Sequence, residues 1–180
     1  ATFLNGALIR WLDFNDTWLA KEWGHPSDNL AIILALVDYL KSHRNTSLNF
    51  KEILNCMVMA HEIQGALAIE NSLNKEGLDH VALVKIASAS VGAKMLGHYD
   101  HQIKAVISNA FIDGQSLRTY RHFPNTGARK SWAAGDASAK ALKQVFISEV
   151  SDESYSTVLS AKNWGFNDVL MGKNPLKLER

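Results

Sequence analysis

Apolar residues recur at helical spacing through most of this chain, and polar stretches interrupt them only briefly. One stripe runs from Leu30 to Leu40 and another from Phe50 to Val58, each with apolar positions three or four residues apart. A third apolar segment, 81–96, includes the small residues of ASASVGA, which allow a neighbouring helix to come close, and Gly97 can end it. The pattern therefore predicts amphipathic helices at 30–40 and 50–58 and a central helix at 81–96.

Two further helices and a shorter one complete the predicted fold. Asp100 is expected to cap a helix that continues to Phe111, another helix starts after Lys130 and reaches Phe146, and a shorter one follows SDESYS (151–156). No run alternates apolar and polar residues for long, so strands are not expected. We predict an all-α domain over residues 1–180, interrupted at 13–28 and 114–130. Loops carried by a rigid scaffold are where chemistry concentrates, so these interruptions hold the candidate site.

The composition disfavours several classes of protein. The 180 residues suffice for one well-buried domain, and 19 Lys and Arg against 18 Asp and Glu disfavour a nucleic-acid binder. Cys56 is the single cysteine, so neither an internal disulfide nor a cysteine-rich metal centre is expected. No run reaches the roughly 18 to 20 apolar residues of a membrane span. We expect a soluble protein of a reducing compartment such as the cytoplasm. The start at Ala1 and the end at NPLKLER suggest a fragment of a longer protein.

A basic stretch, LRTYRHFPNTGARKSW (117–132), contains no carboxylate. Its cation-capable residues are Arg118, Arg121, His122, Arg129 and Lys130. The stretch ends where a helix is predicted to begin, and free N–H groups at helix starts bind anions. Tyr120, Phe123 and Trp132 predict that part of it is buried, where unpaired charge is costly. We therefore predict a site for a small polyanion, with Lys130 and Arg129 foremost. The alternatives are a solvated basic loop and, for the two earlier arginines, a pairing with a helix acid or a dimer contact.

Two histidines are predicted to stand at helix starts. His25 precedes Pro26, which suits the first position of a helix, and His80 follows the possible cap Asp79. The positive end of a helix lowers the proton affinity of an imidazole, which then stays neutral near pH 7 and suits a general base. The alternative for His25 is a capped helix preceded by a turn, with no role in chemistry.

The remaining histidines are assigned structural or solvated places. His61 continues the apolar stripe that begins at Phe50 and is predicted to lie in the core. His43, His98 and His101 lie near predicted helix ends in polar surroundings and are expected to be solvated. Because no two histidines have the spacing of a metal-binding helix with a carboxylate beside them, we predict neither a metal site nor a cofactor.

Three segments resemble the MmgE/PrpD family: LDFNDTWLAKEWGHPSDN, AHEIQGALAIENSLNKEGLDHVALVKIAS and DGQSLRTYRHFPNTGARKSWAAGDAS. The resemblance extends over nearly all 180 residues. It implies an all-α domain that is followed, in longer members, by a smaller α/β domain lacking here. It also implies a carbon–oxygen lyase that removes water from 2-methylcitrate to give 2-methyl-cis-aconitate in propionate breakdown, without an iron–sulfur cluster. A homodimer is implied as well, in the cytoplasm or, in a eukaryote, the mitochondrial matrix.

Site residues carried over from a decarboxylating relative of this fold fall on Asp13, Thr17, His25, His80 and Lys130. We expect the two histidines to act as acid and base, in an order left open. Asp13 orients one imidazole or supplies the acid proton, and Thr17 and Asp16 bind substrate. Asn15, the longer gap from Thr17 to His25, and RKSWAAGDA depart from that relative and resemble the dehydrating members.

Two alternatives to this function stay open. One is an enzyme of the same fold acting on another polycarboxylate, by dehydrating citrate or aconitate isomers or by decarboxylating cis-aconitate. The other belongs to a different class, a helical interaction module whose basic loop binds an acidic protein.

Overall fold

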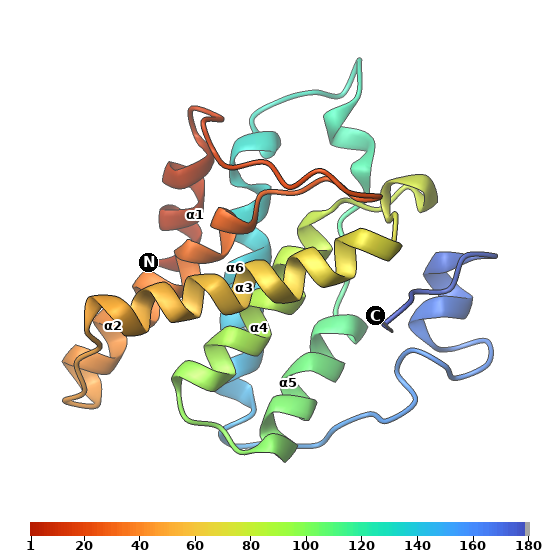
Figure 1. The fold of residues 1–180 in the computed structure, drawn as a ribbon. Coiled ribbons are helices and arrows are strands. Elements are labelled where there is room, and N and C mark those ends of the chain that lie inside the picture. The colour runs from red at the N-terminus through yellow and green to blue at the C-terminus, as the bar shows by residue number, and fades with distance from the viewer. Residues whose placement is uncertain (179–180) are drawn as a thin grey trace.

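The computed structural model describes residues 1–178, which form a helical bundle (Figure 1). Its α-helices are α1 (Thr2–Arg10), α2 (Leu30–His43), α3 (Phe50–Glu70), α4 (Val81–Met95), α5 (Asp100–Ile112) and α6 (Arg129–Ile147). Shorter helical turns are η1 (Pro26–Asn29), η2 (Asn74–Glu76), η3 (Arg118–Arg121) and the π-helical η4 (Asn167–Met171). Extended pairing within 1–178 is limited to isolated bridges, Trp18 with Gly24 and Leu78 with Leu117. The prediction of an all-α fold is confirmed.

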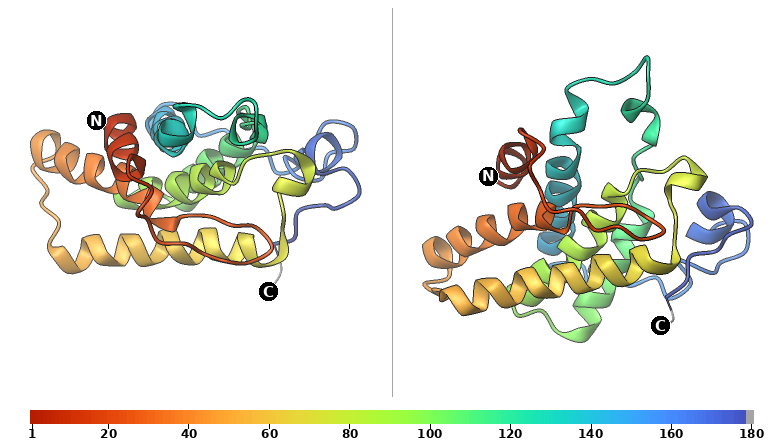
Figure 2. Two further views of the ribbon diagram at one scale, coloured as in Figure 1. Left: turned by 90° about the horizontal axis from the view of Figure 1, so that it is seen from above. Right: turned by 45° about the horizontal axis from the view of Figure 1, so that its top comes forward.

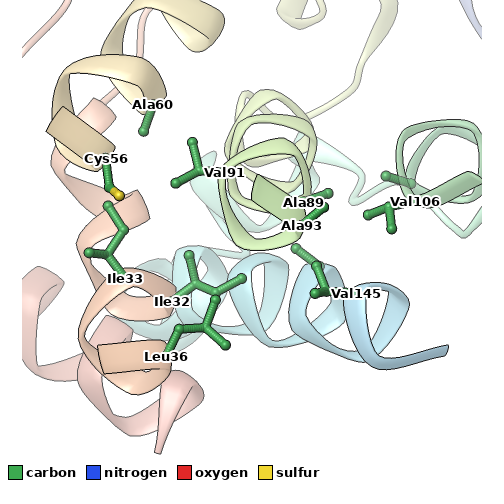
Figure 3. Close-up of a cluster of buried hydrophobic side chains, with 12 residues drawn as sticks. Ile32, Ile33, Leu36, Cys56, Ala60, Ala89, Val91, Ala93, Val106 and Val145 are labelled. Atoms are coloured by element: carbon green, nitrogen blue, oxygen red, sulfur yellow. The ribbon is translucent and has the colours of Figure 1, made fainter. Parts of the chain in front are cut away.

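The predicted central helix is α4, which is buried along most of its length. It packs against α2, α3, α5 and α6, and its small residues Ala89 and Ala93 are fully inaccessible to solvent. Figure 3 shows apolar side chains from the surrounding helices meeting there, with Ile32 from α2 and Val145 from α6 beside the small residues. Close packing of these chains around one helix gives the start of α4 a rigid support.

Helix ends follow local signals in most places. The Asn49 side chain accepts a hydrogen bond from the Glu52 N–H at 3.0 Å, and the Glu52 carboxylate accepts one from the Asn49 N–H at 2.7 Å, so α3 begins with a capping box. Gly97, with a φ of 74°, follows α4 as expected. Asp100 is the first residue of α5 and not its cap, a position that Tyr99 takes.

One predicted helix is absent in its expected form. The segment after SDESYS folds as a series of turns over 156–164, followed by the short π-helical η4. Hydrogen bonds such as Gly165 N–H to the Ala161 carbonyl, 2.7 Å, close these turns one at a time and do not build a continuous α-helix. None of the helices within residues 1–178 is both long and apolar enough to cross a membrane.

The first and last long helices cross at two glycines. A Cβ atom built on Gly6 of α1 would lie 2.4 Å from the Cα of Gly135 in α6, so neither position has room for a side chain. This close crossing places the end of α1, with Arg10, beside the start of α6, with Lys130. Two cationic residues that are far apart in sequence are thereby brought to one place.

The loop between α1 and η1 extends over the C-terminal half of α3, as both views of Figure 2 show. Its Trp18 ring packs directly on Gly65, where a Cβ atom would lie 2.6 Å from the ring. The bridge between Trp18 and Gly24 turns the loop back toward His25. The fold therefore fixes both ends of the first predicted interruption near the start of α4.

Candidate active site

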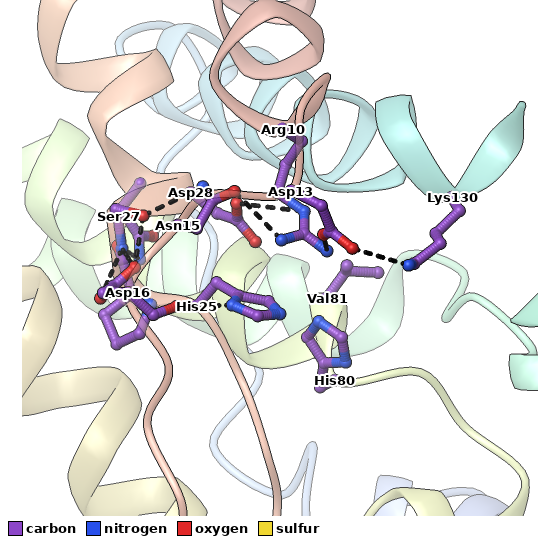
Figure 4. A network of polar contacts seen from close by, with 12 residues as sticks. Arg10, Asp13, Asn15, Asp16, His25, Ser27, Asp28, His80, Val81 and Lys130 are labelled. Atoms are coloured by element: carbon purple, nitrogen blue, oxygen red, sulfur yellow. Dashed lines mark hydrogen bonds and ion pairs between the residues drawn. The ribbon is translucent and has the colours of Figure 1, made fainter.

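Asp13 joins the two cations that the helix crossing brings together. Its carboxylate lies 2.8 Å from Nη2 of Arg10 and 2.8 Å from Nζ of Lys130 (Figure 4). The hydrogen bond from Lys130 is the largest cause that holds the pKa of Asp13 below its usual value, and the Arg10 charge adds to it. Asp13 has a φ of 60°, a left-handed backbone that aspartate tolerates better than most residues and that turns its side chain toward both cations. Arg10 and Lys130 therefore form a binding site for one carboxylate group, and the side chain of Asp13 occupies it.

His25 is held in one tautomer by the loop that precedes it. Its Nδ1 lies 2.6 Å from the Asp16 carbonyl oxygen. A carbonyl only accepts, so Nδ1 carries the proton and the neutral ring has its lone pair on Nε2. Burial is the largest cause that lowers the pKa of His25, and it outweighs the hydrogen bond to Asp16. His25 also precedes Pro26 at the start of η1, as predicted. The side chain is therefore suited to accept a proton through Nε2.

His80 stands at the start of α4 with its ring beside that of His25. The ring centroids are 5.7 Å apart in an edge-on arrangement, and Figure 4 shows both rings next to the cluster of Arg10, Asp13 and Lys130. His80 is 5% exposed, and burial lowers its pKa to about 3. Neither ring nitrogen has a hydrogen-bond partner within residues 1–178, although Asp79 lies 3.4 Å from Nδ1. A buried imidazole with free polar atoms is available to a ligand.

The neutrality of His80 predicts a pH-dependent stability. The unfolded chain protonates this residue near its ordinary pKa of 6.5, whereas the folded protein does so only near 3. Stability is therefore lost as the pH falls below about 6.5. Compared with His80→Leu, the wild type should lose about 2 kcal/mol more unfolding free energy between pH 7.5 and 5. Urea unfolding of both proteins at several pH values measures this difference.

Asp28 does not obscure that comparison. Its raised pKa contributes stability that is lost as the pH rises toward 7, the opposite direction, and the contribution is common to both proteins. Parallel pH curves for the two proteins would contradict a neutral, buried His80.

Arg121 is engaged by Asp79. Its Nε and Nη2 donate to the two carboxylate oxygens at 2.5 and 3.1 Å, and Asp79 is fully buried. Burial alone would raise the pKa of Asp79, but the hydrogen bonds from Arg121 hold it below its usual value. The Asp79 carboxylate also accepts the N–H of Val81, so this pair ties the basic loop to the start of α4. The structure thus gives Arg121 the helix-acid partner that was the alternative to substrate binding.

Breaking this pair is expected to destabilise the fold. Asp79→Asn removes the charge that balances a mostly buried guanidinium, and the free energy of unfolding should fall by about 3 to 5 kcal/mol. Chemical unfolding measures the loss. The surface pair of Arg44 and Glu149, 2.7 Å apart with side chains 47% and 29% exposed, serves as control. Arg44→Ala should cost less than about 1 kcal/mol, and equal losses at the two places would contradict the assignment.

The other predicted site residues are placed less centrally. Arg129 holds its guanidinium 4.4 Å from the Trp132 ring and 3.9 Å from Asp136. Thr17 and His122 are exposed on their loops. The Asp16 carboxylate is taken by protein groups, accepting from the Ser27 N–H at 3.2 Å. Among the predicted residues, the structure therefore gathers His25, His80, Asp13 and Lys130.

Two predictions about single side chains, His61 and His98, are wrong. His61 lies outside the core: its side chain is 35% exposed and faces Asp16 at 3.1 Å, because the apolar stripe it was thought to continue is itself partly exposed. His98 is not solvated, since its side chain is 4% exposed between Ser148 and Glu149. The basic loop is buried in part, as predicted: Tyr120 is buried, although Phe123 is 94% exposed at the tip of the loop.

Sequence reasoning missed two residues of the site, Arg10 and Asp28. Arg10 is 3% exposed, and it also donates to Asn15 at 3.1 Å. Asp28 lies 3.9 Å from Nε of Arg10, and burial raises its pKa to about 7. The position of Arg10 three residues before Asp13, at the end of an apolar segment, was an available signal. The burial of Asp28 depends on tertiary packing, and no local sequence pattern predicts it.

Comparison with known proteins shows the family of this chain. The MmgE/PrpD N-terminal domain matches residues 1–179. The chain is 53% identical to 2-methylcitrate dehydratase of Cupriavidus necator and 53% identical to that of Escherichia coli K12, in each case over 100% of this chain and 38% of the relative. It is 54% identical to the mitochondrial 2-methylcitrate dehydratase of Yarrowia lipolytica, over 97% of this chain and 35% of the relative. The chain spans about two fifths of the length of these curated relatives. It belongs to the MmgE/PrpD family, as predicted.

Proposed function

We propose that this chain is the helical domain of a hydro-lyase that dehydrates 2-methylcitrate to 2-methyl-cis-aconitate in propionate breakdown. The observation that carries the proposal is the pairing of two neutral histidines, 5.7 Å apart, with a carboxylate site of Arg10 and Lys130. Identity of 52% to 54% with named 2-methylcitrate dehydratases over the whole or nearly the whole chain supports the choice of substrate. In this proposal a second domain, which the family resemblance implies, completes the site in the whole enzyme.

The proposed reaction begins at a carbon acid. The proton removed lies next to a substrate carboxylate, and its removal builds negative charge on that carboxylate as an enediolate. Cations fixed beside it stabilise this charge more than they stabilise the bound substrate, which lowers the barrier. Lys130 is the proposed cation, and Arg129 adds positive charge nearby. Arg10 fixes the position of Asp13, the residue that Lys130 contacts. Water leaves when the hydroxyl on the adjacent carbon takes up a proton.

The two imidazoles divide the proton transfers in this proposal. His25 accepts the carbon proton at Nε2, because its Nδ1–H is committed to the Asp16 carbonyl. Its lowered pKa keeps the lone pair available near pH 7. His80, adjacent to it, passes that proton on to the departing hydroxyl, which leaves as water. Asp13 is not the proton source, because its lowered pKa leaves the carboxyl ionised. Thr17 and His122 contribute substrate contacts from their loops.

Product analysis tests the proposed reaction. The complete protein that carries this chain is incubated with 2-methylcitrate, citrate and cis-aconitate in the presence of a chelator. We expect fastest turnover of 2-methylcitrate, with the absorbance of a new conjugated alkene and no carbon dioxide. Carbon dioxide from cis-aconitate would instead identify a decarboxylase, and binding of an acidic protein without turnover would support the interaction module.

The proposal extends to assembly and location. We propose a homodimer without nucleic-acid or membrane partners, in the cytoplasm of a bacterium or the mitochondrial matrix of a eukaryote. The word mitochondrial in the name of the Yarrowia lipolytica relative supports the second location. Light scattering on the purified complete protein measures the oligomeric state.

A further inference from the structure

We propose that His61, acting through Asp16, is a positioning residue that keeps His25 in the tautomer able to accept a proton. The inference rests on the proposed function, in which His25 is the base. It assigns Asp16 to positioning instead of the substrate binding expected from sequence. His61 touches neither the proposed substrate site nor the carboxylate cluster, and its effect is transmitted through one loop residue.

Asp16 connects the two histidines with different atoms. Its main-chain carbonyl accepts the hydrogen bond from Nδ1 of His25 at 2.6 Å. Its carboxylate accepts from the N–H of Ser27 at 3.2 and 3.3 Å and from the Ser27 hydroxyl, and it faces Nε2 of His61 at 3.1 Å. The side-chain contacts therefore fix the peptide group whose oxygen orients His25.

His61 attaches this loop to a rigid element. Its Nδ1 lies 2.9 Å from the Met57 carbonyl of α3, so the ring is oriented by the backbone of a 21-residue helix. Both ring nitrogens face acceptors, and both contacts are hydrogen bonds when the ring carries two protons. The loop on which Asp16 lies has no helix or strand of its own between Trp11 and His25. The His61 contact therefore adds, at Asp16 itself, to the packing of Trp18 on Gly65 and to the bridge between Trp18 and Gly24.

Loss of the attachment has a specific chemical consequence. When Asp16 moves, Nδ1 of His25 loses its acceptor, and the ring gains access to the tautomer with the proton on Nε2. That tautomer cannot take a proton from substrate through Nε2, so the productive fraction of the enzyme falls. Substrate binding depends mainly on the cations and is little changed. The expected pattern is a lower kcat at a nearly constant KM.

The first measurement concerns the ring itself. In protein labelled with 15N-histidine, the nitrogen shifts of His25 report which nitrogen carries the proton. We expect Nδ1–H in the wild type and a mixture of tautomers in His61→Ala. The control is His101→Ala, which removes a histidine that faces Asp152 at 3.0 Å in an exposed pair on the surface. It should leave the His25 shifts unchanged. Unchanged His25 shifts in His61→Ala as well would overturn the proposal.

The second measurement is kinetic and uses the complete protein. We expect kcat of His61→Ala to fall about 10- to 100-fold, the range found for groups that orient metal-bound histidines through a hydrogen bond, with KM changed less than about threefold. Asp16→Asn should lower kcat at least as much, because it also weakens the contacts with Ser27. The double variant should be no worse than Asp16→Asn alone, because His61 acts through Asp16. His61→Gln, which keeps a donor for Asp16, should recover most of the rate and also serves if the alanine variant folds poorly. Additive losses would overturn the coupling.

The two measurements separate this inference from the proposed function. A tautomer change in His61→Ala without any dehydratase activity in the complete protein would keep the coupling and reject the function. An active enzyme whose kcat requires His25 but not His61 would keep the function and reject the coupling.

Discussion

Replacing His25 with alanine is expected to lower kcat for 2-methylcitrate dehydration by about 10²- to 10⁴-fold, the usual contribution of a positioned general base. The residue is half-buried beside His80, its Nδ1–H is fixed by Asp16, and burial lowers its pKa, so that the neutral ring presents Nε2 to a substrate. Initial rates with the complete protein, followed by alkene absorbance, measure the effect. The thermal unfolding midpoint should change little, since the ring is not part of the apolar core.

The control for this variant is again His101→Ala, which removes an imidazole remote from the site. It should keep wild-type kcat. A His25→Ala enzyme with more than about a tenth of wild-type kcat would be incompatible with a general base, and would transfer the role to His80 or to Asp13.

Lys130→Ala is expected to weaken binding of tricarboxylates about 10- to 150-fold, because a charge-assisted hydrogen bond contributes about 1.5 to 3 kcal/mol. The substitution also frees Asp13 from its strongest partner, so the pKa of Asp13 should rise toward its ordinary value. Calorimetric titration of the complete protein with propane-1,2,3-tricarboxylate, which cannot be dehydrated, measures the affinity without turnover.

A control substitution at another lysine separates the loss of a contact at the site from the loss of one positive charge on the protein. Lys104 is exposed on α5, away from the two loops, and Lys104→Ala removes the same charge from the protein. It should bind the ligand as the wild type does. Equal weakening by both substitutions would point to nonspecific attraction, and unchanged affinity in Lys130→Ala would remove this residue from the site.

The helices that the sequence predicted well are those whose buried face is apolar. α4 was recognised because its residues are apolar or small on every side, which is typical of a helix surrounded by others. α1 was not predicted, and its packing explains why. Its buried residues are Thr2, Gly6 and Arg10, whereas Leu4 and Leu8 are 64% and 74% exposed. An apolar stripe therefore indicates the wrong face of this helix.

α3 shows a related difficulty. Phe50 and Val58 belong to the stripe that predicted the helix, yet they are 74% and 60% exposed, and the helix packs through smaller residues such as Ala60 and Gly65. His61 follows the stripe to the partly exposed side, which is why it meets the loop and not the core. Apolar spacing predicted the helix correctly but could not predict which face would be covered.

Some residues of the candidate site could be predicted from local sequence signals, and others are placed only by contacts between distant parts of the chain. His25 and His80 could be placed because helix starts have local signals, Pro26 after one and Asp79 before the other. The contacts of Asp13 with Arg10 and Lys130 depend on the crossing of α1 and α6 at Gly6, which joins parts of the chain more than a hundred residues apart. No local pattern reports such a crossing. The same holds for Asp28, whose raised pKa results from burial among several helices.

Titration with propane-1,2,3-tricarboxylate, observed through the ring resonances of His25 and His80, tests most directly whether histidines and cations form one site. We predict that the resonances of both histidines shift together with a single dissociation constant. Lys130→Ala should raise this constant and leave the shifts at saturation unchanged. Shifts at the exposed His43 and His101 with none at His25 and His80 would contradict a shared tricarboxylate site.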